Sequence, residues 1–404
     1  MNQPNNIVFM MKNFKSLMLG TGVVAALLCA CTTQPGTPKD GAAKQGLDAA
    51  KFDTTYTDAV KGEKKVGLYT LKNEKGMIVN ITNFGGRIAA IYVPDKKGDL
   101  QDVVLGFESA DAYFPQNNAS DFGAAIGRYA NRLNQGKIKC DGKEIQLPQN
   151  NFGHCLHGGP TGWQYQVYDV VESTDTKLVL SMDSPDGDNN FPGNVKAIVT
   201  YTLTADNAIE INYEATTDKE TVVNMTNHSY FNLSGDANNT ILDEILTIDA
   251  DEFTPTDTTY MTTGEKLPVE GTPMDFRAGK AVGEGLDSIT FEQVIWAGGG
   301  YDHNWVLNTK GDASKPCVKL VDNRTGISLE VYTNEPGIQV YTGNFLDGSV
   351  TGKYGIKYKK QTGICLETQK YPDSPNKNWK ESNAYLKPGE TYNSYCKFKF
   401  GVVE

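Results

Sequence analysis

Apolar and polar residues alternate with a period of two over many short segments, and this pattern constrains the fold more than any other feature of the chain. The clearest case is segment 208–215, in which the two faces carry Ile209, Ile211, Tyr213 and Ala215 on one side and Glu210, Asn212 and Glu214 on the other. That period is typical of a half-buried β-strand. Segments 195–203, 327–332 and 338–341 are also strand-like. The chain is therefore expected to be rich in strands.

Turn-forming residues lie between these segments, as in Asp141-Gly142, Asp186-Gly187 and Asn323-Arg324-Thr325-Gly326. Residues 282–296 are the best candidate for an amphipathic helix. Strands that alternate with turns, and not with helices of 10 to 15 residues, favour an all-β fold built as a large antiparallel β-sandwich. Since no second linker interrupts the pattern, we expect one domain over residues 53–404.

The N-terminus has the pattern of a targeting segment, which we place at residues 1–30. Lys12 and Lys15 precede an apolar run, residues 17–30, that is shorter than the roughly 20 residues a membrane-spanning helix needs. It closes with Leu28-Cys29-Ala30-Cys31, which resembles the lipobox of bacterial lipoproteins, whose cysteine is acylated after cleavage. That cysteine is Cys31 here. Cys29 stands where the lipobox pattern more often has a small residue, so a plain secretory peptide is the alternative, and Met11 is an alternative start.

Residues 31–52 are polar and lack apolar periodicity, as expected of a flexible tether between an anchor and a folded body. Thr32 follows the cysteine, and in the sorting pattern that this segment resembles a residue other than Asp there indicates the outer membrane. We therefore expect a protein of the cell envelope, attached to the membrane through a lipid on Cys31 and facing the periplasm.

The net charge of -11 and the isoelectric point of about 5.0 argue against a nucleic-acid partner, because phosphate binding needs a basic surface. A neutral small molecule fits the composition better. The sequence carries no signal for oligomerisation, and we expect a monomer.

The segment 226–233, Thr-Asn-His-Ser-Tyr-Phe-Asn-Leu, gathers hydrogen-bonding side chains around one imidazole between two strand-like runs. An imidazole with an ordinary pKa of about 6.5 exchanges protons near neutral pH. His228 is therefore a candidate for proton transfer. The alternative is a core histidine satisfied by its neighbours.

Four further segments carry chemically capable side chains, and each has a structural alternative. Residues 127–132 offer two arginines, which suit hydroxyl pairs or form a plain surface pair. Residues 154–159 place His157 before two glycines that would let a ligand approach the backbone, and their His-x-x-His spacing without an acidic partner argues against zinc. Asp302 follows a glycine run that is either a binding loop or a turn. Glu367 lies in an apolar run, either at a strand end facing solvent or partly buried with a raised pKa.

Over residues 66–403 the chain resembles the aldose 1-epimerase, or mutarotase, family of the galactose mutarotase type. The five segments follow one another in the same order as the motifs of that family. The resemblance implies a single antiparallel β-supersandwich with an open carbohydrate cleft, no metal and no organic cofactor. It also implies the interconversion of the α and β anomers of free aldohexoses such as glucose and galactose.

The resemblance assigns roles to individual residues. Glu367 would be the general base for the C1 hydroxyl and His228 the general acid for the ring oxygen, on opposite sides of the C1–O5 bond, so that the ring opens and recloses on either face. The substrate-binding residues implied are Asn131, Arg132, His157, Ser229, Tyr230, Asp302 and Gln339. Two other classes of function compete with this one: a glycoside hydrolase with Asp302 and Glu367 as its carboxylate pair, and a carbohydrate-binding lipoprotein without catalysis.

Five cysteines remain after the leader and the anchor, namely Cys140, Cys155, Cys317, Cys365 and Cys396. An odd number without framework spacing means that at least one thiol is free. Cys155 and Cys365 each stand two residues before a site candidate, His157 and Glu367, so in strands they would share its face. We expect them to be buried, inert thiols that line the cleft floor; a disulfide or a metal site is the alternative.

Overall fold

The structure, a computed structural model, describes residues 46–403 except 59–61 and 287–289. The predicted signal peptide, Cys31 and most of the predicted tether lie outside the described residues. The last residues of the predicted tether instead belong to the folded body: they form the 3-10 helix η1 (Ala49–Phe52), and the Leu47 amide donates to Asn80 Oδ1 at 2.9 Å. Phe52 is fully buried beside the ring of Tyr113. The body therefore begins earlier than residue 53, because an apolar ring at position 52 finds a place in the core.

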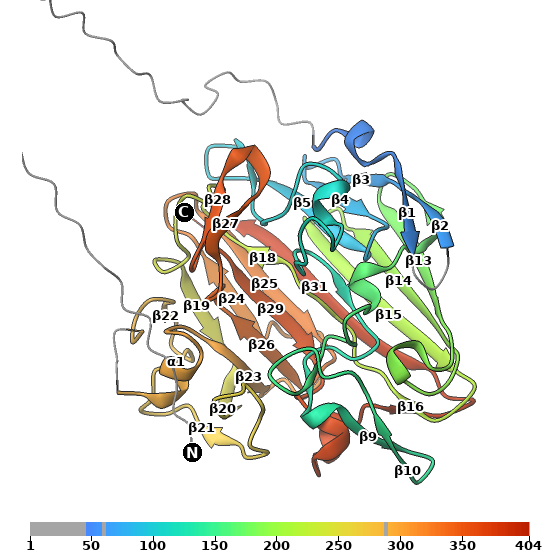
Figure 1. Cartoon of the computed structure of the whole chain (residues 1–404). Helices are drawn as coiled ribbons and strands as arrows, with labels where there is room; N and C mark the ends of the chain where they lie inside the picture. Colours follow the sequence, from blue (N-terminus) through green and yellow to red (C-terminus); the bar gives the residue numbers. More distant parts are fainter. Residues whose placement is uncertain (1–45, 59–61, 287–289, 404) are drawn as a thin grey trace, which may run out of the picture. The chain divides into compact units, whose positions relative to one another are not determined.

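The largest sheet has nine strands, and it forms one layer of the molecule (Figure 1). Its spatial order is β12 (Asp169–Ser173), β13 (Lys177–Ser184), β14 (Val195–Leu203), β15 (Ala208–Thr217), β31 (Tyr392–Val402), β25 (Ile327–Thr333), β24 (Val318–Val321), β19 (Ile245–Ile248) and β22 (Lys280–Ala281). Every pairing in it is antiparallel. β15 shows the predicted alternation, with Ile209, Ile211 and Tyr213 buried in the core and Asn212 and Glu214 exposed.

A six-stranded antiparallel sheet carries the residues of functional interest. Its order is β18 (Tyr230–Phe231), β29 (Ile364–Gln369), β26 (Gly337–Tyr341), β23 (Asp302–Leu307), β20 (Ala250–Thr254) and β21 (Leu267–Pro268). The Phe231 ring packs on that of Phe398 in β31, with centroids 4.9 Å apart. This contact brings the six-stranded sheet face to face with the nine-stranded one, so that their apolar faces share one core.

A four-stranded sheet, β3 (Leu68–Lys72), β4 (Ile78–Thr82), β5 (Arg87–Pro94) and β6 (Leu100–Asp102), contributes to the same core. Six two-stranded ladders complete the strands: β1 (Thr54–Asp58) with β2 (Gly62–Val66), β7 (Ala125–Ile126) with β17 (Thr226–Asn227), β8 (Arg132–Leu133) with β11 (Cys155–Leu156), β9 (Lys137–Cys140) with β10 (Lys143–Gln146), β16 (Thr221–Val222) with β30 (Tyr385–Leu386), and β27 (Asp347–Thr351) with β28 (Lys357–Lys359). The predicted large antiparallel β-sandwich is thus confirmed.

The predicted helix over 282–296 is wrong in its extent. Within the described residues only α1 (Glu292–Trp296) is α-helical, because the segment before it contains turns around Gly283 and Gly285. The remaining helical turns are 3-10: η2 (Asp111–Tyr113), η3 (Asn134–Gly136), η4 (Trp163–Tyr165), η5 (Asp188–Asn190), η6 (Lys353–Gly355), η7 (Ser374–Asn376) and η8 (Lys380–Ser382). In the part of the chain that the structure describes, no helix has the length and apolarity to cross a membrane.

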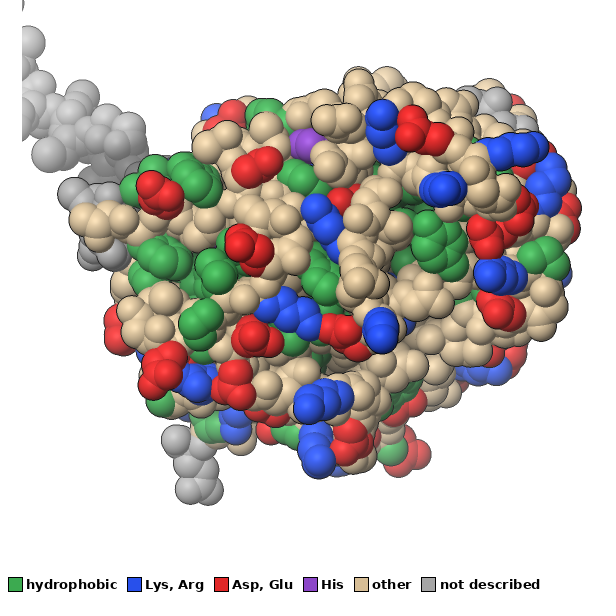
Figure 2. Space-filling model, turned by 90° about the horizontal axis from the view of Figure 1, so that it is seen from below, with side chains coloured by type: hydrophobic (Ala, Val, Ile, Leu, Met, Phe, Trp, Pro, Cys, Tyr) green, Lys and Arg blue, Asp and Glu red, His purple; other side chains and the backbone are tan. Residues whose placement is uncertain are grey.

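The molecular surface mixes both signs of charge. On the face drawn in Figure 2, acidic and basic side chains are interspersed and no broad area of one sign appears. This face offers no continuous basic stripe of the kind that tracks a nucleic-acid backbone.

Replacing Phe52 by alanine tests whether the body includes the end of the predicted tether. Because the ring is fully buried, Phe52→Ala should lower the free energy of unfolding by about 3–5 kcal/mol, measured by urea denaturation. The exposed neighbour Lys51 supplies a control, since Lys51→Ala should change the free energy of unfolding by less than about 0.5 kcal/mol. Equal stability of the two variants would place Phe52 outside the cooperative fold.

Candidate active site

Strand β29 places a carboxylate in the wall of the sandwich. Its alternate residues Ile364 and Leu366 belong to the core, so Cys365 and Glu367 point to the opposite face. That face forms part of a cavity of about 340 Å³. Glu367 is only 2% exposed. It is therefore buried and does not face solvent at a strand end, which was the other alternative left by the sequence.

The pairing of strands brings distant parts of the sequence to this face. Glu367 lies opposite Gln339 of β26, and Tyr230 of β18 lies opposite Cys365. Asp302, the first residue of β23, lies opposite Tyr341. These strands are neighbours in Figure 1, and their register fixes the spacing between the side chains.

The opposite wall comes from two loops joined by the short β8–β11 ladder, in which Arg132 pairs with Leu156. The Asn131 amide donates to His157 Nδ1 at 3.1 Å, and the His157 amide donates to the Asn131 carbonyl at 3.2 Å. Asn131, Arg132 and His157 therefore reach the cavity as one unit.

His228 and Glu367 lie side by side on the cavity floor. The distance from His228 Nε2 to Glu367 Oε1 is 3.5 Å, and His228 is 5% exposed. At this distance no sugar atom fits between the two groups. The two groups therefore do not lie on opposite sides of the substrate's C–O bond, as expected. They lie next to each other, and both face the cavity.

The Cys365 thiol is the second polar neighbour of the His228 ring. Burial raises the pKa of this thiol well above its usual value, so the sulfur keeps its hydrogen and can donate. It lies 3.5 Å from His228 Nδ1, and the tautomer of the ring decides which of the two atoms donates. The other ring nitrogen, Nε2, is the one next to Glu367 Oε1.

Glu367 has the pKa of a group that both takes and returns a proton at neutral pH. Burial is the main cause and raises its pKa to about 7; His228 and Arg132 oppose the rise, whereas Asp302 and Asp121 add to it. Its Oε2 atom has no hydrogen-bond partner within the described residues.

His157 acts as a neutral hydrogen-bond donor. Burial lowers its pKa to about 3, and its Nδ1 already accepts from the backbone, so the remaining proton is on Nε2. Asp302 is held as an acceptor, since its Oδ1 receives a 2.7 Å hydrogen bond from Gln339 Nε2. Arg132 donates from Nε to Asn151 Oδ1 at 3.1 Å and lies over the ring of Tyr260.

The structure brings eight of the nine predicted catalytic and binding residues into the cavity wall; the exception is Ser229. Its neighbours His228 and Tyr230 both line the cavity, whereas Ser229 is buried and its hydroxyl has no hydrogen-bond partner within the described residues. Its role as a binding residue stays a prediction; successive side chains of an extended segment point in different directions, so it does not share the face of its two neighbours.

Sequence reasoning missed six lining residues: Asp121, Asn151, Phe152, Leu156, Tyr341 and Phe345. Tyr341 carried a signal, because it lies two residues after Gln339 on one strand and so shares its face. The other five lie in loops or in a two-residue strand, where no periodicity marks them. Asp121 adds a carboxylate, whose Oδ1 accepts from Tyr165 Oη at 3.2 Å.

The remaining motif residues have structural roles. A side chain at Gly158 would place its Cβ 2.2 Å from the Gly127 carbonyl oxygen, so this glycine permits close backbone packing and not, as expected, the approach of a ligand. Arg128 is buried and donates to Ser184 Oγ at 2.6 Å. His154 and His303 contact Thr259 and Gln293 through their Nε2 atoms.

All five body cysteines are buried and free, which confirms the predicted buried thiols and excludes a disulfide among them. Cys365 contacts His228 and underlies the cavity. Two sets of side chains bring possible metal-ligating atoms within 4.8 Å of one another: Asp121, His157 and His228, and His228, Cys365 and Glu367. Both sets contain His228, so a metal held by either would occupy the imidazole that proton transfer requires.

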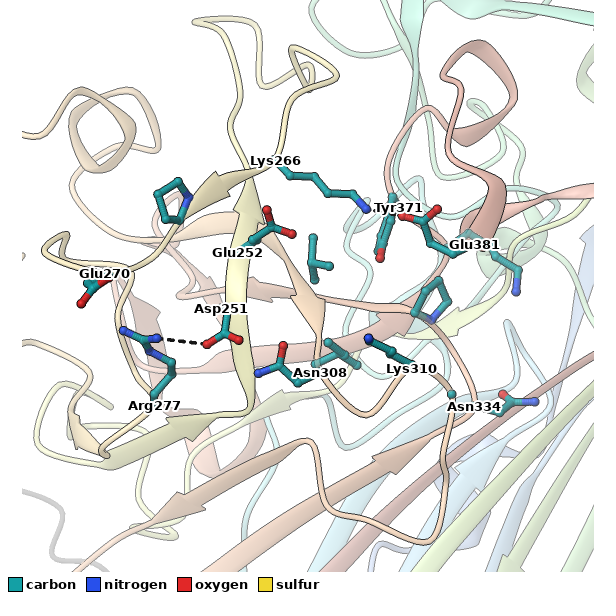
Figure 3. A pocket seen from close by; sticks show the side chains of 16 residues that line it. Asp251, Glu252, Lys266, Glu270, Arg277, Asn308, Lys310, Asn334, Tyr371 and Glu381 are labelled. Atoms are coloured by element: carbon teal, nitrogen blue, oxygen red, sulfur yellow. Dashed lines mark hydrogen bonds and ion pairs between the residues drawn. The ribbon is translucent and has the colours of Figure 1, made fainter.

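A larger cavity, of about 860 Å³, lies at the other end of β23, where Val306 and Leu307 reach it (Figure 3). Its acids and bases largely neutralise one another: Arg277 pairs with Asp251 at 3.0 Å, and Lys266 pairs with Glu381. No imidazole lines it. The proton-transfer chemistry therefore belongs to the smaller cavity.

Comparison with known proteins identifies relatives along most of the chain. The sequence model of the family described as aldose 1-epimerase matches residues 67–399. The galactose mutarotase of Homo sapiens is 42% identical over 326 residues, which cover 80% of this chain and 91% of the relative. The aldose 1-epimerase of Escherichia coli (strain K12) is 37% identical over 335 residues, which cover 82% and 94% of the two chains.

Solved structures show the same fold. The aldose epimerase homologue from C. elegans superposes with a TM-score of 0.77 at 31% identity and covers 84% of this chain and 100% of its own. The galactose 1-epimerase from Lactobacillus acidophilus NCFM gives a TM-score of 0.74 at 28% identity and covers 84% and 96% of the two chains.

The raised pKa of Glu367 predicts a cost in stability that depends on pH. A carboxyl whose pKa is about 7 in the folded protein and 4.5 in the unfolded chain favours unfolding above pH 7 and has no such effect below pH 4.5. The pKa difference of about 2.5 corresponds to about 3 kcal/mol. Glu367→Gln should therefore be more stable than the wild type by up to about 3 kcal/mol at pH 8, and by far less at pH 5.

Urea denaturation at the two pH values measures this difference. The exposed Glu214 of β15 supplies the control, because Glu214→Gln should stay within about 0.5 kcal/mol of the wild type at both. A stability difference for Glu367→Gln that does not change with pH would contradict the assignment.

Proposed function

The chain belongs to the aldose 1-epimerase family, and from this membership we propose that His228 and Glu367 carry its activity, the interconversion of the α and β anomers of aldoses. The observation that supports the two residues is their placement: an imidazole nitrogen and a carboxylate oxygen 3.5 Å apart on the floor of one polar cavity. The related mammalian proteins are named galactose mutarotases, and we propose free aldohexoses, with galactose among them, as substrates.

Ring opening takes one proton from the hydroxyl on C1 and adds another to the ring oxygen, which is bonded to the same carbon. Glu367 accepts the proton of the C1 hydroxyl while the protonated His228 donates a proton from Nε2 to the ring oxygen. The C1–O5 bond breaks, the open-chain aldehyde forms, and His228 is left as a neutral imidazole. Rotation about C1–C2 presents the other face of the carbonyl. Reclosure then returns the proton from Glu367 to the C1 oxygen and the ring-oxygen proton to His228, which gives the other anomer.

Placement of the acid and the base side by side suits this chemistry, because both target oxygens are bonded to C1. A base with a pKa of about 7 also suits a reaction that runs in both directions, since it releases its proton as readily as it takes it.

The other lining residues would hold the sugar. His157 Nε2–H and the Arg132 guanidinium offer donors, and Asp302 offers a carboxylate acceptor oriented by Gln339. The amide of Asn131 and the hydroxyl of Tyr230 complete the polar wall. A set of donors and acceptors without a cluster of cations fits an unphosphorylated sugar.

We also propose that a lipid on Cys31 attaches the protein to the membrane of the cell envelope, as the outer-membrane type of lipoprotein facing the periplasm. The support is the sequence Leu28-Cys29-Ala30-Cys31 followed by a polar tether with Thr32 in its first position. A monomer would suffice for the reaction, because the described residues of one chain supply all the side chains named above.

Removing either proton-transfer group should abolish most of the activity. Glu367→Gln and His228→Asn should each lower kcat by about 10²–10⁴-fold, because neither amide can exchange the proton. Glu367→Gln also keeps the shape of the original side chain. Polarimetry on freshly dissolved α-D-galactose and α-D-glucose measures the rate, and calorimetry on the variants should still detect sugar binding. Near-normal rates in either variant would refute its role.

Two controls accompany this assay. His154→Asn, which removes an imidazole outside the cavity, should keep the rate within several-fold. A disaccharide incubated with the protein should yield no new reducing ends; their appearance would indicate a glycoside hydrolase. Unchanged optical rotation kinetics with the wild type would indicate a binding protein without catalysis.

The lipid anchor has its own test. Expressed in a Gram-negative host, the full chain should incorporate radiolabelled palmitate and sediment with membranes, whereas Cys31→Ser should do neither. Palmitate labelling that persists in Cys31→Ser, or its absence in the wild type, would refute the anchor without bearing on the enzyme activity.

A further inference from the structure

The ring of His228 differs from those of the other three histidines in what its nitrogens contact. In His154, His157 and His303, Nδ1 accepts a hydrogen bond from a backbone amide, at 3.0, 3.1 and 3.2 Å. An accepting Nδ1 places the proton of a neutral imidazole on Nε2, so neither nitrogen of these rings has a free lone pair for a metal ion. The set of possible metal ligands that contains His157 is therefore incomplete. In the part of the chain that the structure describes, no backbone amide fixes the His228 ring in this way.

Both polar neighbours of the His228 ring are residue types that bind zinc. Nδ1 lies 3.5 Å from Cys365 Sγ, and Nε2 lies 3.5 Å from Glu367 Oε1. One possible ligand atom of each of the three residues lies within 4.8 Å of those of the other two. The ligand atoms of a tetrahedral zinc ion, at about 2.0–2.3 Å from the metal, are about 3.5 Å from one another, so a movement of roughly 1 Å would bring all three to one ion.

The sheet holds these three residues together, and the cavity gives an ion access to them. Cys365 and Glu367 are alternate residues of β29 and share one face of it. His228 stands just before β18, which pairs with β29 through Tyr230 and Cys365. Glu367 and His228 line the active-site cavity, so an ion can reach them from solvent, and water in the cavity can supply the fourth ligand of a tetrahedral site.

The charges around Glu367 favour a divalent cation. Zinc bound to one thiolate and one carboxylate is a neutral unit, which avoids burying a net charge. Burial is the main cause of the raised pKa of Glu367; Asp302 and Asp121 add to it, whereas His228 and Arg132 oppose it. The two aspartates that disfavour a further negative charge at this place attract a cation to it, and Arg132 offsets part of that attraction.

Each of the two anionic ligands has a feature that suits metal binding. Glu367 Oε2 is buried and has no hydrogen-bond partner within the described residues, so a metal would satisfy an oxygen that is costly to bury unpaired. Burial raises the pKa of the Cys365 thiol, and a hydrogen bond from Tyr230 opposes this rise. The Tyr230 hydroxyl therefore stabilises the sulfur as a thiolate once a metal has replaced its proton, as hydrogen bonds behind metal ligands commonly do.

We propose that His228, Cys365 and Glu367 form a binding site for Zn²⁺, and that zinc bound there inhibits the enzyme reversibly. On binding, the S–H bond of Cys365 breaks, a Zn–S bond forms, and the proton leaves to solvent. The ion then occupies the nitrogen and the carboxylate that would transfer protons. The inhibition rests on the proposed function of His228 and Glu367, whereas the binding of zinc does not.

Zinc titration of the full chain, treated with a chelator and produced without a histidine tag, tests the site. Polarimetry on freshly dissolved α-D-galactose gives the inhibition constant, relative to the zinc-free rate of the same variant, and calorimetry gives the dissociation constant. Zinc should inhibit the wild type, and EDTA should restore its rate. Cys365→Ser should raise both constants at least about 100-fold, because it removes a ligand, and loss of an outer partner alone costs about 10–100-fold in metal affinity.

Cys155→Ser is the matched control. Cys155 is also buried and also stands two residues before a residue of the cavity wall, but it belongs to neither set of possible metal ligands. Its replacement should leave both constants within several-fold of those of the wild type. Cobalt(II) in place of zinc reports the sulfur directly: the difference spectrum between the wild type and Cys365→Ser should contain the near-ultraviolet charge-transfer band of a cobalt–thiolate bond. Circular dichroism verifies that each variant is folded.

The outcomes separate this site from the proposed function. Constants that Cys365→Ser leaves unchanged, a cobalt complex without the charge-transfer band, or a wild type that zinc neither binds nor inhibits would overturn the zinc site. Absence of anomer interconversion by the zinc-free wild type would instead overturn the function of His228 and Glu367, and the dissociation constants and the cobalt band would still decide the site. A rise of both constants confined to Cys365→Ser, together with the band, would establish it.

Discussion

The chemistry of this protein depends on the burial of one carboxylate in the wall of a β-sandwich. Loss of water around Glu367 disfavours its charged form and raises its pKa to about 7, where it binds and releases a proton with equal ease. A fully exposed glutamate would be a far weaker base. The surrounding groups limit the rise, because His228 and Arg132 favour the charged form and Asp302 and Asp121 disfavour it. The working pKa is thus a balance between desolvation and a few nearby charges.

The sandwich makes this burial possible because the two faces of β29 serve different purposes. Ile364 and Leu366 anchor the strand in the core, and that anchoring holds Cys365 and Glu367 rigidly on the other face. The neighbouring strands then place Gln339 and Tyr230 by register alone. Backbone hydrogen bonds of a ladder hold such distances more firmly than a loop does, which is what acid–base transfer across a few ångströms requires.

Much of this arrangement was predictable from residue patterns, and the rest was not for identifiable reasons. Period-two segments predicted β15 and the antiparallel sandwich, because burial on one face imposes that alternation directly. The motif order predicted the cavity residues on the sheet. Ser229 is outside the cavity lining because a motif marks neighbours in sequence, whereas successive side chains of an extended segment point in different directions. Asp121 and Phe152 went unnoticed because loop positions depend on tertiary contacts, and Phe52 because a short polar segment conceals one anchoring ring.

The active site combines residues without backbone strain and loop residues with it. His228 and Glu367 have ordinary backbone conformations, whereas Asn131, Phe152, His157 and Tyr260, which lie in loops, all have positive φ. Loop residues of this kind can be replaced, and their loops can be lengthened, without moving the strands, because the core of the sandwich does not depend on the loops. Proton transfer is therefore fixed by the sheet, while the choice of sugar is left to the loops. A fold organised in this way can change its substrate range through loop residues and keep one reaction.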